Sequence, residues 1–348
     1  MSTWQDLKNN PRLKNIYDTR LAIIRAVREF FWSQNFVEAA TPIAVRFASQ
    51  EPYLNPFTVT IKHPSGQEYP FFLHTSPEYA LKKLLAVGYQ NLFEITQCFR
   101  NVEDFGGTHN PEFTMLEWYR SPGKLSDIMD DTEKLFRFVL KKISKAQLEY
   151  QGKKIVVNES WERLTMKEVW QKYLGVNLDE YLELATMQNL AAERGYTVAT
   201  NDAYEDLFFK LFLNEIEPKL GLTKPIFVYE YPARMCSLSR ISDRDARYAE
   251  RFELYIGGLE VANAFGELTN AIKQEKNLEE DKKLRLDLGK STWPVDPDFI
   301  SALKSGISKE KGGLVSGIAL GLDRMVVLCT GAKDVNEVIF DSIKDQIT

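Results

Sequence analysis

A stretch of alternating hydrophobic and polar residues, followed by a loop and a returning strand, predicts a β-hairpin in the first third of the chain. Residues 93–100 read Phe-Glu-Ile-Thr-Gln-Cys-Phe-Arg, which has the two-residue period of a half-buried strand. The residues that follow carry the turn signals Gly106-Gly107 and Asn110-Pro111. Residues 113–119 then return as a second strand, so the hairpin brings side chains from both strands close together.

The rest of the hydrophobic pattern predicts helices between short strands, with apolar residues recurring at helical spacing or alternating. Helices are expected over residues 13–34, 125–142, 165–173, most of 177–222, 273–290 and 296–306, and strands over residues 51–60, 68–74, 225–232 and both sides of the Gly257-Gly258 turn in 249–269. The mixed charges of residues 273–290 favour a solvent-facing helix with no further role. No chemistry is expected within residues 177–222.

The first hairpin concentrates residues that carry chemistry. It has a cation at Arg100, an imidazole at His109, an aromatic ring at Phe113 and carboxylates at Glu112 and Glu117. This combination suits the binding of a nucleotide together with an amine. The alternative is a polar edge hairpin whose charges are solvated.

Residues 75–85 predict the start of a helix. Ser76 can cap it, Pro77 suits its first position, and Glu78 is favoured at the positive end of the helix dipole. Capping alone explains Glu78, although a carboxylate there can also bind a ligand.

Two further segments carry candidate site residues. Glu253 and Glu260 flank the Gly257-Gly258 turn, and nearby carboxylates repel unless a cation lies between them. Mg²⁺ with phosphate ligands prefers such oxygen donors, but both residues could also be exposed strand carboxylates. In residues 317–328, glycines allow close backbone approach to a ligand, and the guanidinium of Arg324 could stack on a base.

Composition narrows the class of protein. The 348 residues suffice for one large domain or two ordinary ones, and the net charge of −5 gives no general attraction to nucleic acid. The three cysteines are far apart, which argues against a disulfide framework or a zinc site. The N-terminus is polar and no run of about 18 apolar residues occurs, so a cytoplasmic protein without membrane segments is expected.

Residues 100–120, from Arg100-Asn101 through His109-Asn110-Pro111-Glu112-Phe113 to Glu117-Trp118-Tyr119-Arg120, resemble motif 2 of class II aminoacyl-tRNA synthetases. The lysyl branch is most similar, and within it the short paralogues that attach beta-lysine to elongation factor P. The helix, strand and Pro42 that begin the chain resemble motif 1, and residues 317–328 resemble motif 3.

The resemblance covers about residues 15–345 and implies an α+β fold. It implies a six- or seven-stranded antiparallel sheet flanked by helices, in a single catalytic domain spanning residues 1–348. It also implies a homodimer formed through motif 1 and a helical insertion at about residues 177–222. No glycine motif of a dinucleotide or P-loop fold is present.

The resemblance further implies ATP and Mg²⁺ as cofactors and assigns roles by position. Arg100 and Arg324 would be catalytic, and Glu253 and Glu260 would bind the metal. The implied ATP-binding residues are Arg100, Asn101, Val102, His109, Asn110, Phe113, Glu260, Val261, Gly321 and Arg324. The implied substrate-binding residues are Ser76, Pro77, Glu78, Glu117, Tyr119, Asn263, Glu267 and Ala319.

An acidic pocket of Glu78, Glu117 and Glu267 matches a substrate with two ammonium groups, which is lysine or beta-lysine. Lysyl-tRNA synthetases have glycine at the position of Ala319, whereas the short paralogues have alanine there, as this sequence does. The alanine favours (R)-beta-lysine. No anticodon-binding OB-fold is expected before motif 1, so tRNA is an unlikely acceptor and a lysine of elongation factor P is the implied one. The alternatives are a truncated lysyl-tRNA synthetase with another acceptor and a catalytically silent regulatory paralogue.

The sequence departs from the family pattern at Val102, where the family has glutamate, and the loop to His109 is one residue longer. The family glutamate reads the adenine amino group. Either Glu103 replaces it after a shift of register, or that contact is lost.

Overall fold

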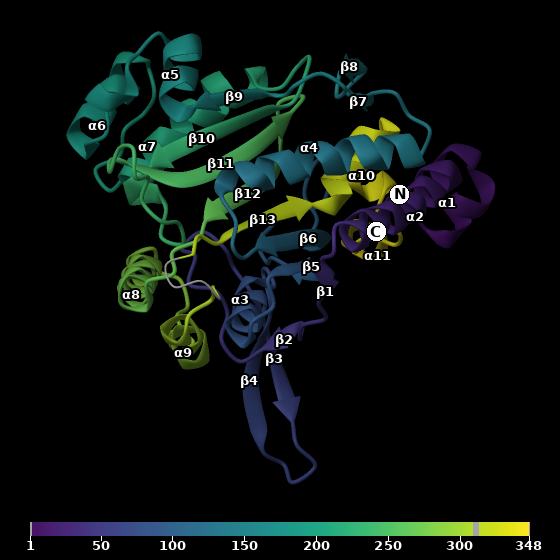
Figure 1. The fold of residues 1–348 in the computed structure, drawn as a ribbon, viewed down its shortest axis with the longest axis horizontal. Helices are drawn as coiled ribbons and strands as arrows, with labels where there is room; N and C mark the ends of the chain where they lie inside the picture. Colours follow the sequence, from purple (N-terminus) through teal and green to yellow (C-terminus); the bar gives the residue numbers. More distant parts are fainter. Residues whose placement is uncertain (1, 309–312, 348) are drawn as a thin grey trace.

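An eight-stranded sheet forms the centre of the computed structural model, which describes residues 2–308 and 313–347 (Figure 1). In spatial order its strands are β1 (Val37–Glu38), β5 (Asn91–Phe99), β6 (Glu112–Arg120), β13 (Ser316–Gly321), β12 (Leu259–Gly266), β11 (Tyr248–Ile256), β10 (Ile226–Pro232) and β9 (Glu162–Thr165). The six central strands are antiparallel to their neighbours, whereas β1 and β9 pair in parallel at the two edges. The expectation of six or seven antiparallel strands was therefore wrong at the edges, where short strands give no alternating pattern.

Helices cover the sheet and extend beyond it. They are α1 (Trp4–Asn9), α2 (Pro11–Ser33), α3 (Glu78–Val87), α4 (Leu125–Lys142), α5 (Met166–Leu174), α6 (Leu184–Glu193), α7 (Tyr204–Leu211), α8 (Ala271–Asp287), α9 (Pro297–Ser305), α10 (Leu322–Thr330) and α11 (Ile343–Ile347). Shorter helical turns lie at Leu178–Glu180, Phe212–Ile216, Glu217–Lys219, Ala233–Met235 and Val335–Glu337. None of the helices in the described part of the chain combines the length and the apolar character needed to span a bilayer.

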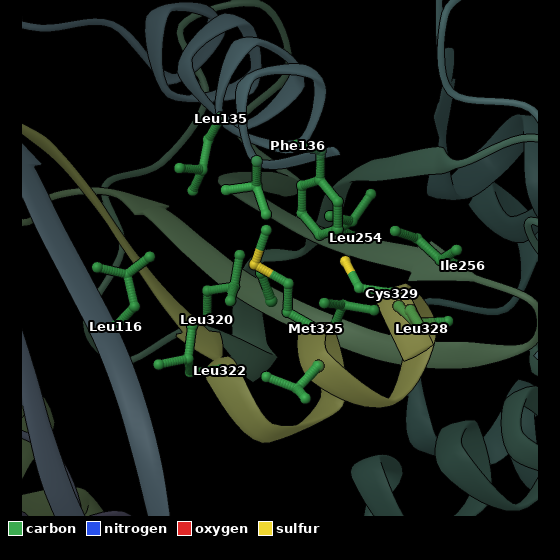
Figure 2. Close-up of a cluster of buried hydrophobic side chains, with 14 of the residues drawn as sticks. Leu116, Leu135, Phe136, Leu254, Ile256, Leu320, Leu322, Met325, Leu328 and Cys329 are labelled. Atoms are coloured by element: carbon green, nitrogen blue, oxygen red, sulfur yellow. The ribbon is translucent and has the colours of Figure 1, made fainter. Parts of the chain in front are cut away.

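One face of the sheet is buried along its length by α2, α4 and α10. Figure 2 shows Leu135 and Phe136 of α4 and Met325 of α10 packing against strand residues such as Leu254 and Leu320. Burying large side chains of this kind contributes about 1.5–3 kcal/mol each, so this layer is the main core. The predicted helices over residues 13–34 and 125–142 are confirmed, although Leu21 faces solvent.

The opposite face is covered only toward its two ends. Helices α5, α6 and α7 pack on β10 and β11 at one end, through buried residues such as Val228 and Tyr255. Helices α3, α8 and α9 pack at the other end, against Leu92 of β5 and Tyr119 of β6. Strands β13 and β12 lie between these two groups of helices.

A small three-stranded sheet projects from the body as a hairpin (Figure 1). It consists of β2 (Ala44–Val45), β3 (Phe57–Lys62) and β4 (Glu68–Leu73), and a separate pair is formed by β7 (Leu148–Tyr150) and β8 (Lys153–Ile155). The strand expected over residues 51–60 begins only at Phe57. The reason is that Arg285 of α8 donates to the carbonyl oxygens of Glu51 and Leu54, each at 2.7 Å, so this segment is held by a side chain instead of a partner strand.

The same contact corrects the interpretation of residues 273–290 as a purely solvent-facing helix. Arg285 is 2% exposed, and its guanidinium lies 4.4 Å from the ring centre of Trp293. Gln274 and Leu278 of α8 are also buried. Helix α8 therefore has a buried face despite its mixed charges, and this face holds residues 51–54 in place through the hydrogen bonds of Arg285.

Candidate active site

One row of cross-strand neighbours crosses the sheet. Glu253 of β11 lies opposite Asn263 of β12, which lies opposite Ala319 of β13, which lies opposite Glu117 of β6. Directly opposed residues in a sheet project to the same face. The register therefore places these four predicted site residues side by side on one surface.

At the β6 end of the row, Glu117 is buried and held by two hydroxyl groups. Ser76 Oγ donates to its Oε2 at 2.8 Å, and the Tyr119 hydroxyl donates to its Oε1 at 2.5 Å. Burial, together with the negative charge of Glu78, raises the pKa of Glu117 to about 8. A cationic ligand would favour the ionised form.

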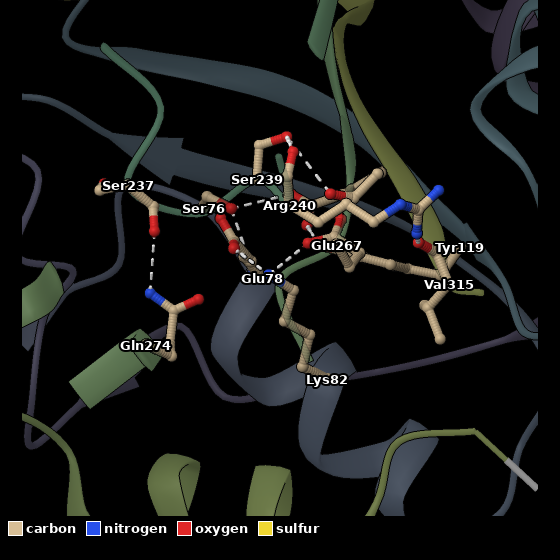
Figure 3. A network of polar contacts seen from close by, with 12 residues as sticks. Ser76, Glu78, Lys82, Tyr119, Ser237, Ser239, Arg240, Glu267, Gln274 and Val315 are labelled. Atoms are coloured by element: carbon tan, nitrogen blue, oxygen red, sulfur yellow. Dashed lines mark hydrogen bonds and ion pairs between the residues drawn. The ribbon is translucent and has the colours of Figure 1, made fainter. Parts of the chain in front are cut away.

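Glu78 and Glu267 share one buried cation, Lys82 (Figure 3). The Lys82 Nζ lies 2.5 Å from Glu78 Oε1 and 2.6 Å from Glu267 Oε2, and the residue is 0% exposed. Burial raises the pKa of Glu267 to about 7, although Lys82 opposes this shift. The sequence interpretation missed Lys82, whose position one helical turn after Glu78 was the available signal.

Helix α3 begins one residue later than expected. Pro77 is its N-cap and Glu78 its first residue, so Ser76 is not the cap and Pro77 is not the first helical position. Ser76 Oγ nevertheless accepts from the Glu78 backbone N–H at 3.0 Å while donating to Glu117. Ser76 thus connects the helix start to the acidic pocket.

Gly317 of β13 gives the Tyr119 ring its space. A Cβ at this position would lie 2.2 Å from Tyr119 Cε1 and 2.7 Å from Glu267 Oε1, distances that real Cβ atoms do not adopt. A Cβ at Gly321 would instead make ordinary contact, 3.5 Å from Arg324 Cδ. The packing of Tyr119 and Glu267 against this strand therefore requires a glycine at position 317, whereas the packing of Arg324 does not require one at position 321.

At the β11 end of the row, Glu253 is surrounded by donors. Tyr231 donates to its Oε2 at 2.6 Å, the Tyr255 hydroxyl donates to the same oxygen, and Arg251 Nη2 lies 2.5 Å from Oε1. Glu260, which pairs with Tyr255 in the hairpin, keeps 40% of its side chain exposed. Partial desolvation and the nearby charge of Glu253 raise the pKa of Glu260.

A third carboxylate, Glu217, approaches this pair from the segment expected to carry no chemistry. The Gly258 N–H donates to the Leu220 carbonyl at 2.7 Å and the Gly257 N–H to the Gly221 carbonyl at 2.8 Å, which presses residues 217–221 onto the β11–β12 turn. Burial, followed by the charges of Glu260 and Glu253, raises the pKa of Glu217 to about 7. Only tertiary contacts bring Glu217 here, so no sequence pattern could have revealed it.

These oxygen donors fit a hard cation that also has other ligands. No group of three or more His, Cys, Asp and Glu side chains within the described residues has metal-binding geometry by itself. Mg²⁺ commonly takes one or two carboxylates and completes its shell with water and phosphate oxygens. Glu260, with Glu253 beside it, is compatible with that mode.

The predicted nucleotide-binding residues lie around the loop between β5 and β6. The Arg100 guanidinium lies 5.0 Å from the ring centre of Phe113, and Arg324 Nη2 lies 3.0 Å from His109 Nε2. Burial and the Arg324 charge lower the pKa of His109, so its neutral ring nitrogen can accept from Arg324. Arg324 also donates to the Glu260 carbonyl at 2.6 Å, which links this group to the carboxylate pair.

The other predicted ATP-binding residues differ in whether their side chains could reach a nucleotide. The Val261 side chain lies in the hydrophobic core, so only its backbone could reach a nucleotide, and buried Asn110 donates to the Glu112 carbonyl at 2.5 Å. Val102 is 83% exposed and has a φ of +61°, a left-handed conformation that β-branched residues rarely adopt. Asn101 is exposed, and its Oδ1 accepts from the Val102 N–H at 2.9 Å.

The family model of class II tRNA synthetases (D, K and N) matches residues 2–341. The chain belongs to this family. Among curated relatives of the synthetase fold, the elongation factor P–(R)-beta-lysine ligase of Pseudoalteromonas translucida is 38% identical over 326 residues, which cover 92% of this chain and 93% of that relative. Proteins of the same name from Pectobacterium atrosepticum and Proteus mirabilis are 36% and 33% identical, over 93% and 97% of this chain and 94% and 98% of their own lengths.

The resemblance to class II synthetases and to their short beta-lysine ligase relatives is thereby confirmed, as is the α+β fold with its largely antiparallel sheet. In synthetase terms, motif 1 comprises α2 and β1, motif 2 comprises β5, β6 and their loop, and motif 3 comprises β13 and α10.

A buried polar network joins the three synthetase motifs behind the site. Arg20 of motif 1 is ion-paired with Asp323 of motif 3, and its Nη2 donates to Thr114 Oγ1 of motif 2 at 2.7 Å. The Thr114 N–H donates to Asp323 Oδ2 at 2.8 Å. Asp323 immediately precedes Arg324, so the network fixes the start of the helix that carries this arginine.

The raised pKa of Glu117 predicts how the stability of the unliganded synthetase domain depends on pH. Between the ordinary glutamate pKa of 4.5 and about 8, the native state keeps a proton that the unfolded state has lost. Stability contributed by Glu117 is therefore present at low pH and is lost as pH rises through this window, by roughly 2–4 kcal/mol in total. Glu117→Gln should remove this dependence, so the urea midpoint of the wild type should fall relative to that of the variant as pH rises from 4.5 to about 8. Exposed Glu68→Gln is the control, and parallel curves for Glu117→Gln and wild type would contradict the prediction.

Proposed function

We propose that this chain activates (R)-beta-lysine with ATP and Mg²⁺ and transfers it to a lysine side chain of elongation factor P. The observation that carries the proposal is the buried pocket of Glu78, Glu117 and Glu267 beside Tyr119, which suits a substrate with two ammonium groups. The names of relatives that are 33–38% identical support the same substrate and acceptor.

The first step needs a positioned carboxylate and a neutralised phosphate. A substrate carboxylate oxygen attacks the α-phosphorus of ATP, a new phosphorus–oxygen bond forms, and the bond to the bridging oxygen breaks to release pyrophosphate. Arg100 would neutralise the charge that grows on the α-phosphate, and Phe113 and Arg324 would hold the adenine. Glu260, with Glu253, would hold Mg²⁺, which when bound neutralises charge on the phosphates.

The second step transfers the acyl group without a protein nucleophile. The ε-amine of the acceptor lysine attacks the carbonyl carbon of the adenylate, an amide bond forms, and AMP leaves with the electrons of the broken acyl–phosphate bond. The pocket contributes by selecting the substrate. A substrate without the second amine leaves buried carboxylates unpaired, and sites built to pair such groups can reject it by about 10⁴-fold.

The surface of motif 1 supports a proposal of homodimerisation. Leu21 and Trp32 of α2 and Val37 of β1 are about half exposed, and β1 is the edge strand of the main sheet. An apolar surface beside an open sheet edge is a typical site for a second copy. Because the proposed acceptor is a translation factor, we propose the cytoplasm as the place of reaction.

The test is ATP–pyrophosphate exchange with (R)-beta-lysine and L-alpha-lysine in parallel, each with and without purified elongation factor P and mass analysis of that factor. Exchange that favours beta-lysine, with a mass gain on the factor, is the expected result. Exchange that favours alpha-lysine, with charging of tRNA and no mass gain, would indicate a truncated lysyl-tRNA synthetase. No exchange with either substrate would indicate a catalytically silent paralogue.

A further inference from the structure

Lys82 is a buried cation with no place in the activation step described above. Its side chain reaches from α3 toward Glu78 and Glu267 (Figure 3) and is fully buried. Its Nζ lies 5.9 Å from the ring centre of Phe299, and its two ion-pair partners are Glu78 and Glu267. A lysine is rarely buried completely unless it is paired, so both contacts are needed to keep it there.

The charges around Lys82 do not cancel. The pocket holds three carboxylates, Glu78, Glu117 and Glu267, against this single ammonium. Arg240 also lies near Glu267, but it is ion-paired with Glu250 and donates to the Val315 carbonyl. These three carboxylates therefore carry two more negative charges than Lys82 neutralises when all three are ionised, and Glu51 adds a further carboxylate near Glu78.

Two excess negative charges match the two ammonium groups of beta-lysine. The short contacts of Lys82 Nζ are with Glu78 Oε1 and Glu267 Oε2, and the second oxygens of the two carboxylates are Glu78 Oε2 and Glu267 Oε1. Glu267 Oε1 lies beneath Gly317, close to the Tyr119 ring. The lysine thus holds both carboxylates from the α3 side and leaves oxygens for a ligand.

We propose that Lys82 is a positioning residue that acts through Glu78 and Glu267. It fixes the two carboxylates relative to each other and sets the pocket charge to match a diammonium substrate. This inference rests on the proposed function for its substrate, but the ionic arrangement can be tested without that substrate.

The first experiment measures urea unfolding of the unliganded wild type, Lys82→Met and Lys83→Met at pH 5.5 and 8.5. Methionine nearly preserves the volume of lysine and removes its charge. Glu51, Glu78, Glu117, Glu267, Tyr79, Tyr119 and Arg240 are titratable groups that face Lys82 or its partners. Without Lys82, the ionised carboxylates repel one another, so the variant should lose stability more steeply as pH rises.

The ratio of the unfolding constants of Lys82→Met and wild type should rise at least about tenfold between these pH values, which is one pKa unit of differential interaction. Lys83→Met is the matched control, because Lys83 neighbours Lys82 on α3 but pairs with Asp296 outside the pocket. Equal pH dependence in both variants would show that Lys82 only fills space, and would overturn the inference whether or not the proposed function holds.

The second experiment measures exchange kinetics. Lys82→Met should lower kcat/KM for (R)-beta-lysine by roughly 10- to 100-fold and leave the KM for ATP within about twofold. Lys82→Ala should recover activity with added propylammonium, which supplies the missing cation, and not with 1-propanol, which has a similar size. Equal recovery with both additives, or unchanged kinetics in Lys82→Met, would overturn the inference, whereas an inactive wild type would instead reject the proposed function.

Discussion

Replacing Arg100 by alanine is expected to lower kcat for pyrophosphate exchange by about 10³-fold, which corresponds to about 4 kcal/mol of transition-state stabilisation. The reason is that Arg100 is assigned to neutralise the charge that develops on the α-phosphate, and arginines that serve a phosphoryl group in this way contribute about 10³- to 10⁵-fold. The fold should survive, because the side-chain contact of Arg100 in the described structure is with the Phe113 ring. Initial rates at saturating ATP and beta-lysine, together with the melting temperature, provide the measurement.

Two variants control this prediction. Arg12→Ala removes a half-exposed arginine that pairs with Glu337 at the surface, and its exchange rate should stay within about twofold of wild type because exposed pairs contribute little. Arg100→Lys keeps the charge but loses the planar fork, so its rate should lie between those of wild type and Arg100→Ala. A normal rate for Arg100→Ala would remove Arg100 from the mechanism.

The sequence was sufficient to predict the main elements and most of the candidate pocket, but not how the residues meet. Alternation identified the strand over 93–100, and the turn signals of the loop that follows it indicated a returning strand over 113–119. The row from Glu253 to Glu117 depends on the register of β11, β12, β13 and β6. Register between distant strands is set by the shared core and leaves no local pattern.

The residues missed by the sequence interpretation share one cause, which is that their environment is created by distant segments. Lys82 is a charged residue on a helix and would ordinarily be solvated, but α9 and the end of β12 enclose it. Arg285 lies in a highly charged helix and is buried by residues 51–54 and Trp293. Glu217 reaches the carboxylate pair only because its segment is bonded to the β11–β12 turn.

The short strands at the two sheet edges differ in how far the sequence predicted them. The strand expected just before Pro42 is confirmed as β1, although its two residues are too few for an alternating pattern, whereas β9 was missed because it precedes the capping box of α5 so closely that the helix signal dominates. Both pair in parallel with a neighbour that is distant in sequence. These two strands form because β5 and β10 have unpaired edges to which they can hydrogen-bond, and not because of their own composition.

Replacing Asp323 by alanine is expected to lower the free energy of unfolding by about 3–5 kcal/mol, because it leaves the buried Arg20 guanidinium without its counter-ion. It also frees the Thr114 N–H and loosens the start of the helix that carries Arg324, so exchange should fall as well. Urea unfolding of the purified variant measures the first effect and pyrophosphate exchange the second.

The double variant Arg20→Met/Asp323→Leu separates the cost of an unpaired charge from the value of the pair. Replacing a buried ion pair by apolar residues of similar volume is often neutral or stabilising, so the double variant should be more stable than Asp323→Ala. Its exchange rate should nevertheless remain low, because the network that aligns motifs 1, 2 and 3 is absent. Asp18→Ala breaks an exposed pair with Lys14 on α2 and should change stability by less than about 0.5 kcal/mol. If the double variant were as unstable as Asp323→Ala, the lost hydrogen bonds to Thr114, and not the unpaired charge of Arg20, would account for the destabilisation.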